Sequence, residues 1–272
     1  MSNVCILTDS TAQLIQPDFP GHERVYTIPF DLQVVKRSGD VSQPVSRSAQ
    51  PRLIPPSPQD FIRYYTHLGH KFDSILVLTL SSLLSAAMDN AISASTQYSN
   101  NSTVKVVDSQ TAAIGLGMLV QAAAGAASQG ASLAEIEQQV RVAIPHIYIV
   151  FCIPDLMYLA RAGHLDRAQA MVGEIMGMLP IFTLEEGRLV PMEKVRTPRH
   201  LFEAFQDFMS EFDAPTHIAL VHGMNHNTLR TRPLRQYIEE FFPKTPFSEY
   251  PIQPHLAALF GPQTIGLIVS EF

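Results

Sequence analysis

The sequence predicts an α/β protein of two domains, residues 1–153 and 154–272. The first half alternates short apolar runs with segments of helical periodicity, the pattern of a parallel sheet with helices on both faces. The chain has 272 residues, enough for two domains of ordinary size, and 46% of them are apolar. After His146 longer strands, a hairpin and amphipathic helices appear. This change predicts a second α/β or α+β domain.

In the first half, strand and helix signals follow one another in order. An N-cap cluster, Asp9-Ser10-Thr11, ends the first apolar run and predicts a helix behind it. Ser57 and Pro58 have the residue types of an N-cap and a first helical position. Gly130 separates two later helices. The predicted strands cover residues 4–8, 24–29, 74–80 and 104–107, and a further helix is expected over 83–96.

The second half opens with an apolar strand over residues 147–153. A β-hairpin is predicted where Glu185-Glu186-Gly187 separates two runs of alternating residues, 179–184 and 188–195. Further strands are expected over 218–221 and 264–269. One helix is expected over 155–162. A second begins at Asp166 and is interrupted at Gly173 and Gly177, and a third follows the strand over 218–221 and ends near residue 242. One strong amphipathic helix carries Leu201, Phe202, Phe205, Phe208, Met209 and Phe212 on one stripe.

One long segment lacks any periodicity. Residues 38–58 contain five prolines and no alternation of apolar and polar residues. Such a stretch is a loop, and a long loop inside a compact domain usually serves a site.

The charge composition argues against nucleic-acid binding. Nineteen Lys and Arg stand against twenty-five Asp and Glu, a net charge of −6, and no basic run is present. Neutralising phosphates needs a basic footprint. Arg230, Arg232 and Arg235 are the nearest approach to one, and a solvated helix face explains them better.

The N-terminus has neither the basic region nor the apolar region of a signal peptide. No apolar stretch is long enough to span a bilayer, so no stable membrane insertion is expected. Cys5 and Cys152 lie in apolar runs and are expected to be buried thiols. The sequence therefore predicts a cytoplasmic protein.

No catalytic or cofactor motif is recognisable. The chain has no nucleophile elbow and no phosphate-binding loop, and Gly115-Leu116-Gly117 lacks the third glycine of a dinucleotide fingerprint. His222 and His226 have metal-ligand spacing, but His222 ends a predicted strand, so the pair does not share one helical face. No cofactor and no metal are expected.

Polar pairs follow three of the predicted parallel strands. Asp9-Ser10, Ser81-Ser82 and Asp108-Ser109 should meet at the carboxyl edge of the sheet, where open α/β sheets bind ligands. Helix capping explains Asp9, Asp108 and Ser109 at least as well. Three hydroxyls, Ser81, Ser82 and Ser85, gather at a helix N-terminus, which favours an anionic head group. A cap followed by ordinary helix serines is an equal alternative.

Through a series of short motifs, the chain resembles the DegV family along essentially its whole length. No single motif is diagnostic, but their order and spacing are specific. They are Thr8-Asp9-Ser10-Thr11, Pro56-Ser57-Pro58, Ser81-Ser82-x-Leu84-Ser85, Val107-Asp108-Ser109, Gly115-Leu116-Gly117, Tyr158-Leu159-x-x-x-Gly163, Pro180-Ile181, Val195-Arg196-Thr197 and Gly261-Pro262.

The resemblance implies a two-domain fold with a long-chain fatty acid held between the domains. It also implies a separate kinase that receives the acyl chain and makes an acyl-phosphate. The serine that contacts the carboxylate would be Ser85, with Ser82 beside it. Arg196 would lie near the head-group opening, although a surface Arg pairing with Glu193 is an alternative.

Several positions depart from the family pattern. Leu53 stands where the family has a threonine that contacts the carboxylate, and Leu259 stands where it has a histidine. The family's Gly-Thr is Ala86-Ala87, and its Gly-Gly-Arg arginine is His164. Two of three expected head-group contacts are therefore apolar. His255, four residues before Leu259, is a possible substitute, though an ordinary surface or core histidine is an alternative.

These observations predict a carrier that presents a fatty acyl chain to a partner enzyme without catalysis of its own. The alternative is a diverged homologue that binds a different or more neutral ligand, or only another protein. A hydrolase using Ser82 or Ser85 is a third reading, weakened because no His or Asp can be paired with either serine from the sequence.

Overall fold

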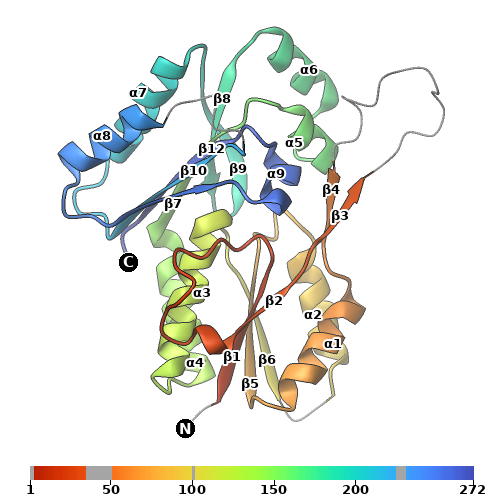
Figure 1. Ribbon diagram of the computed structural model, residues 1–272. Coiled ribbons are helices and arrows are strands. Elements are labelled where there is room, and N and C mark those ends of the chain that lie inside the picture. The colour runs from red at the N-terminus through yellow and green to blue at the C-terminus, as the bar shows by residue number, and fades with distance from the viewer. Residues whose placement is uncertain (1–2, 35–50, 100–101, 225–230) are drawn as a thin grey trace, which may run out of the picture.

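Two large sheets, stacked end to end with helices around them, form most of the protein in a computed structural model, and a two-stranded sheet lies beside them (Figure 1). The structure describes residues 3–34, 51–99, 102–224 and 231–272. The N-terminal half forms the lower body in Figure 1 and the C-terminal half most of the upper one. The mixed α/β class expected from the sequence is confirmed.

The first sheet has the strand order β2-β1-β5-β6, and all its pairings are parallel. Its strands are β1 (Val4–Asp9), β2 (Val25–Ile28), β5 (Ser74–Thr79) and β6 (Thr103–Asp108). Helices α1 (Pro58–Gly69) and α2 (Ala87–Gln97) pack together on one face. Helices α3 (Ala113–Ser128) and α4 (Leu133–Ala143) cover the other, and η1 (His22–Arg24) lies beside α3.

Strand β1 is buried on both faces. Val4 and Ile6 belong to the apolar cluster under α3, whereas Cys5 and Leu7 belong to the cluster under α1 and α2. A strand covered on both sides has a continuous apolar sequence, which is the run seen here. Cys5 is a buried, unbridged thiol as predicted, and so is Cys152 in the second sheet.

The cap of α1 was predicted from the sequence, and the structure adds a second capping box before α4. Ser57 accepts the Asp60 N–H and donates to the Asp60 carboxylate, a capping box with Pro58 at the first helical position. Ser132 and Glu135 form the same box before α4. Such local devices depend on residues three apart, so they are visible in the sequence.

Two other expected starts were wrong. No helix follows Asp9, because its carboxylate accepts both the N–H and the hydroxyl of Thr11 and closes a tight turn. Helix α2 begins at Ala87, four residues later than expected, because the Leu84 and Ser85 N–H groups turn back to the Ser81 carbonyl. Residues 80–86 are therefore a loop, called here the serine loop.

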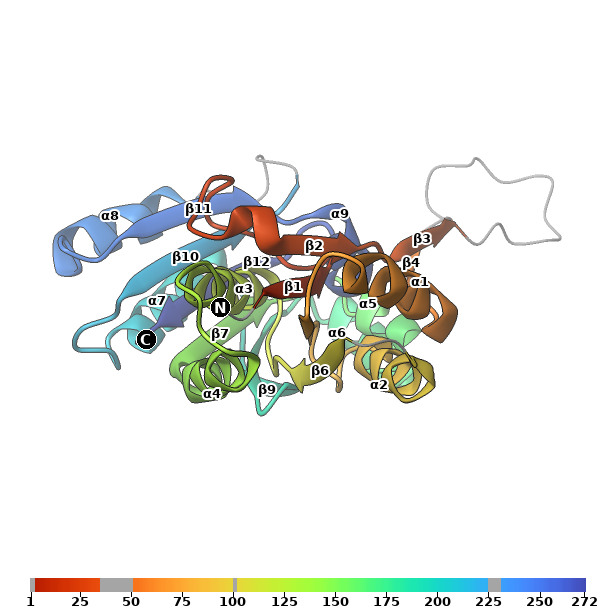
Figure 2. The ribbon, with the colours of Figure 1, turned by 90° about the horizontal axis from the view of Figure 1, so that it is seen from below.

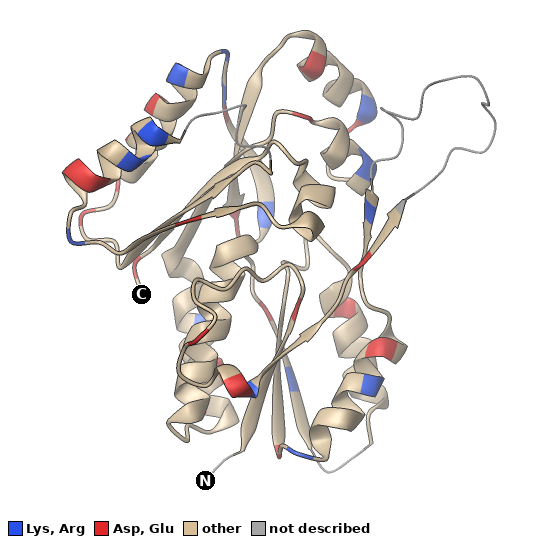
Figure 3. Cartoon of the chain, viewed as in Figure 1, with Lys and Arg blue, Asp and Glu red and all other residues tan. Residues whose placement is uncertain are grey.

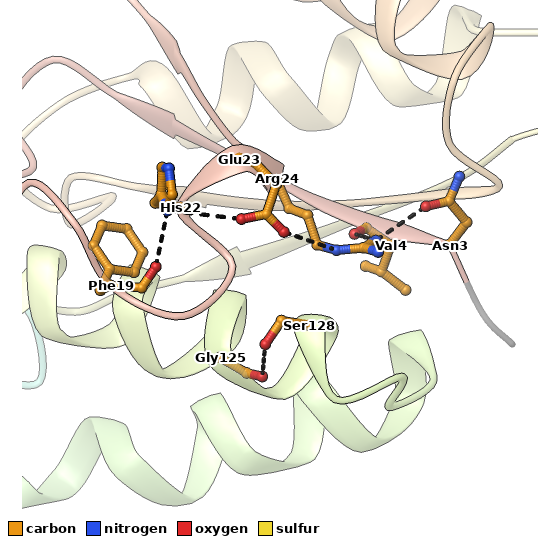
Figure 4. Close-up of polar contacts among 8 residues, drawn as sticks. All are labelled: Asn3, Val4, Phe19, His22, Glu23, Arg24, Gly125 and Ser128. Atoms are coloured by element: carbon orange, nitrogen blue, oxygen red, sulfur yellow. Dashed lines mark hydrogen bonds and ion pairs between the residues drawn. The ribbon is translucent and has the colours of Figure 1, made fainter.

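The loop between β1 and β2 is tied to the first sheet through Arg24 (Figure 4) and approaches α3 at Gly21. Arg24 donates through Nη1 to the Asn3 side chain and to the Val4 carbonyl, which fixes the start of β1. Gly21 has φ 83°, and a Cβ there would lie 2.1 Å from the Ala124 carbonyl oxygen on α3. The Arg24 bonds tie this segment, which includes η1, to the start of β1, and the missing Cβ at Gly21 lets it approach α3 closely.

The second sheet has the order β11-β10-β12-β7-β8-β9, and only its β10–β11 pairing is parallel. Helices α7 (Pro198–Met209) and α8 (Arg232–Phe241) cover one face, and the predicted stripe of α7 is buried there. The strands are β7 (Ile147–Cys152), β8 (Leu179–Glu185), β9 (Arg188–Val195), β10 (His217–His222), β11 (Phe247–Pro251) and β12 (Ile265–Ser270). The other helical segments are η2 (Ile144–His146), α5 (Met157–Ala162), α6 (Arg167–Ile175) and α9 (Pro254–Phe260).

The structure adds to and corrects the expected second half. Strand β11 and helix α9 were not predicted, because each is short and flanked by prolines. Gly173 lies inside α6 without interrupting it. Strand β7, which precedes the predicted domain boundary at 153/154, pairs with β12 and β8 of the second sheet. The boundary itself stays a prediction.

Part of the predicted long loop is a strand. Strand β4 (Pro51–Ile54) pairs antiparallel with β3 (Asp31–Val34), and Leu32 lies opposite Leu53. Strand β4 begins at Pro51 and is followed by Pro55, so its own sequence does not indicate a strand. Its partner β3 lies about twenty residues earlier in the chain, too far away to give a local signal. Residues 38–50 of the predicted loop lie outside the described part of the chain.

The two halves share one apolar core. A single cluster runs from Ile6 and Leu76 under α3 to Phe151 and Phe260 in the second half. Helix α3 packs against β1 of the first sheet and against β7 and β12 of the second, and Figure 2, seen from below, shows it next to β1. Lys and Arg are scattered over several elements rather than gathered on one face (Figure 3). Within the described ranges, no helix has the length and apolarity needed to cross a bilayer.

Candidate functional site

The serine loop lies where the two halves meet. The Ser81 hydroxyl donates to the carbonyl of Gly187, in the β8–β9 turn, at 2.7 Å. The Leu84 carbonyl accepts from Nε2 of His164, which follows α5, at 3.2 Å. Both partners belong to the second half of the chain, so this loop is held from two sides. Ser81 is fully buried, and its hydroxyl is committed to this contact.

Ser82 is paired with a carboxylate. Its hydroxyl donates to Asp108 Oδ2 at 2.5 Å, and its N–H donates to Oδ1 at 3.1 Å. The Gln110 N–H donates to the same Oδ1. Asp108 therefore links the end of β6 to the serine loop, a role that the sequence left open between capping and ligand binding.

Ser85 stands at the start of α2. Its Oγ accepts the Ala87 N–H at 3.2 Å, and its side chain is partly exposed. Within the described residues no acceptor is bonded to the Ser85 hydroxyl, so its proton is available to a ligand. Of the three serines, Ser85 best fits the role of a donor to a bound head group.

Asp9 and Ser10 are bound internally. Asp9 is fully buried, and besides Thr11 it accepts the Leu80 N–H at 2.6 Å, which ties the ends of β1 and β5 together. Burial raises the pKa of Asp9, and its hydrogen bonds and the nearby His255 oppose that rise. The Ser10 hydroxyl accepts the Phe30 N–H. Contact of either residue with a ligand stays a prediction.

The two leucines at divergent positions belong to neighbouring elements. Leu53 is on β4 and Leu259 on α9, these elements pack together, and α5 packs against both. Leu259 is 3% exposed, and Leu53 is partly buried against the same shared cluster, which also contains Leu84 of the serine loop. The wall formed by β4, α5 and α9 is therefore apolar at both positions.

His164 completes this region on the side of the second half. Gly163 ends α5 with φ 85°, a left-handed conformation that turns the chain toward the serine loop. Burial lowers the pKa of His164, although its bond to the Leu84 carbonyl partly opposes the shift. The ring is therefore neutral at pH 7.

Arg196 lies apart from the other predicted residues. It follows the last residue of β9, at the opposite end of the β8–β9 hairpin from Gly187, and it is exposed. No Arg196–Glu193 ion pair is present in the described structure. The described structure therefore supports neither a position of Arg196 near the head-group opening nor its pairing with Glu193. Contact of Arg196 with a partner stays a prediction.

A metal site is not supported within the described ranges, where no cluster of three His, Cys, Asp or Glu could hold an ion. His222 is buried at the end of β10, and His226 lies outside those ranges. Sequence reasoning missed three contacts of the serine loop, Ser82 with Asp108, Leu84 with His164 and Ser81 with Gly187. The Asp-Ser repeat after β6 was a signal for the first, whereas nothing local indicated the other two.

Comparisons with known proteins agree with this architecture. The profile described as "Uncharacterised protein, DegV family" matches residues 3–271. A DegV domain-containing protein of Caldanaerobacter subterraneus is 29% identical over 82% of this chain and 83% of its own. A structure described as fatty acid binding of a DegV family protein from Thermus thermophilus has 25% identity and a TM-score of 0.81, over 99% of this chain and all of its own.

A third match carries a named ligand. The Streptococcus pneumoniae fatty acid kinase B3 protein, solved loaded with linoleic acid, has 18% identity and a TM-score of 0.81, over 99% of each chain. At that identity the likeness concerns the fold. The family profile covers nearly the whole sequence, and the chain belongs to the DegV family.

Proposed function

We propose that this protein is a carrier for a long-chain acyl lipid and has no catalytic activity of its own. The observation that carries the proposal is the single apolar core shared by both halves, which reaches the serine loop at Leu84. The Thermus relative, at 25% identity, is described as binding fatty acid. Burying a tail of about a dozen methylenes would contribute roughly 10 kcal/mol gross, at about 0.8 kcal/mol per CH₂.

The partner belongs to the same proposal. The Streptococcus pneumoniae neighbour is named as part of a fatty acid kinase. By that analogy the acyl chain held here would be presented to an acyl-phosphorylating kinase. Cytoplasmic localisation is the corresponding expectation.

A second candidate is a diverged carrier of a different or more neutral lipid, or an interaction module without a lipid. Leu53 and Leu259 favour the neutral lipid, because an ionised carboxylate next to apolar side chains loses its solvation without gaining a partner.

Protein purified from a heterologous host should carry a long-chain lipid in about one equivalent. An apolar core that spans both halves would retain such a ligand through purification. Native mass spectrometry before and after solvent extraction measures it. Only apo protein, with no uptake of fatty acid or fatty alcohol on titration, would argue against any carrier function.

Incubation with ATP and a fatty acid, or with a chromogenic ester, should give only background turnover. Within the described residues no histidine is bonded to Ser82 or to Ser85, so neither serine belongs to the Ser–His pair that activates a hydrolase nucleophile, and the carboxylate of Asp108 is the only base bonded to Ser82 there. Phosphate release and ester cleavage are the measurements. Turnover that Ser85→Ala abolishes would identify Ser85 as a nucleophile.

A further inference from the structure

From the contacts of the serine loop, we infer that the head-group end of the site takes an uncharged group bearing a proton. The class is a long-chain protonated carboxylic acid, primary alcohol or primary amide. This inference rests on the proposed carrier function and names the ligand more narrowly.

Ser82 is already engaged in hydrogen bonds within the protein. Both its hydroxyl and its N–H already donate to Asp108. A ligand carboxylate at this position would have to remove Ser82 from Asp108, and it would then lie beside a second carboxylate. Like charges at such a distance repel, and partial burial strengthens the repulsion. Ser82 is therefore a poor anion donor in this chain.

The hydrogen bond of His164 fixes which ring nitrogen carries the proton. Its Nε2 lies 3.2 Å from the Leu84 carbonyl, and a carbonyl only accepts, so Nε2 carries the proton. In the neutral ring, Nδ1 then carries a lone pair. This Nδ1 is the one acceptor that the His164 ring can offer, and it suits a ligand that donates.

The positively charged groups around the serine loop are exposed or interact with other residues. Arg52 is next to Leu53, Arg161 and Arg167 are each three residues from His164, and all three are exposed. His255 interacts with the buried Asp9 carboxylate. Asp155 precedes α5 and is hydrogen-bonded to Glu174 of α6, so this acidic pair lies at the other end of α5 from His164. Among the described residues, no cation is bonded to the serine loop to compensate a bound anion.

These contacts have a quantitative consequence for a fatty acid. If only the protonated acid binds, its apparent affinity is set by the protonated fraction, which falls tenfold for each pH unit above the carboxyl pKa. A carboxyl group in water titrates at about pH 4 to 5. The dissociation constant of the acid should therefore rise about tenfold per unit between pH 6 and 8.

Isothermal titration of delipidated protein with four C14 ligands at pH 6, 7 and 8 tests this. Tetradecanoic acid should weaken about tenfold per pH unit, whereas tetradecanol and tetradecanamide should bind equally at all three. Methyl tetradecanoate, which lacks a proton to donate, should bind about tenfold more weakly than the alcohol. Constant affinity for the acid from pH 6 to 8 would overturn the inference. Failure of all four ligands would overturn the carrier function itself.

Two variants should change the pH slope. Asp108→Asn removes the neighbouring carboxylate, and His164→Arg places a cation at the serine loop. In each variant the dissociation constant of the acid should therefore rise by about threefold or less per pH unit instead of about tenfold. Retained binding of tetradecanol shows that the site of each variant is intact. Glu193→Gln, an exposed carboxylate on β9, is the matched control and should behave as wild type. An unchanged slope in both site variants that still bind tetradecanol would overturn the inference.

Discussion

Replacing Leu53 with Thr and Leu259 with His together should tighten binding of an ionised fatty acid by roughly tenfold or more. The two residues are on neighbouring elements, β4 and α9, and both belong to or pack on the shared apolar cluster. A hydrogen bond to a charged group contributes about 1.5 to 3 kcal/mol, so one well-placed donor is enough for the effect. An imidazole beside the carboxylate should increase the gain where it is protonated.

Isothermal titration of both proteins at two pH values, with the acid and its methyl ester, measures this effect. The neutral ester should bind both proteins similarly, which separates head-group recognition from general repacking. Equal affinity of wild type and double variant for the anion would show that Leu53 and Leu259 do not line the head-group site.

Gly117→Ala should lower the free energy of unfolding by about 3 kcal/mol or more, or prevent folding. Gly117 is buried in α3, and a Cβ there would lie 2.0 Å from the backbone carbonyl oxygen of Gln13. Neither backbone can move cheaply, because the Gln13 N–H donates to the Ala113 carbonyl and the Gln13 side chain donates to the Pro251 carbonyl in the second half. Overpacking a well-packed core typically costs about 1 to 3 kcal/mol, and a backbone clash belongs at the upper end.

Gly125→Ala on the same helix is the matched control. The nearest atom to its Cβ is the Pro20 carbonyl oxygen at 4.0 Å, so the added methyl group fits. Alanine in a helix interior is better than glycine by about 0.8 to 1 kcal/mol, so this variant should be as stable as wild type or slightly more stable. Urea denaturation of the two variants measures both values. Equal stability of Gly117→Ala and wild type would mean that the loop around Gln13 moves away from α3 without cost.

The sequence by itself determined the fold class and most of the elements. The all-parallel first sheet was readable because its central strands are buried on both faces and so are apolar throughout. The start of α1 was readable because Ser57 caps with a residue three positions later. The β8–β9 hairpin was readable because its turn at Glu186 and Gly187 requires left-handed backbone. All of these signals are local, and a local signal is complete within the sequence.

The site depended on the tertiary structure. Polar residues after the parallel strands were expected to meet at one edge, and Ser82 does meet Asp108 there. Which of them bind each other, and which of them keep a proton for a ligand, was decided by contacts between residues far apart in the chain. Leu84 with His164 and Ser81 with Gly187 are separated by 80 and 106 residues. The β3–β4 pairing and the placement of β7 in the second sheet have the same origin. Such contacts leave no periodicity or capping pattern, because each partner is ordinary in its own segment and only the packing of the two halves brings them together.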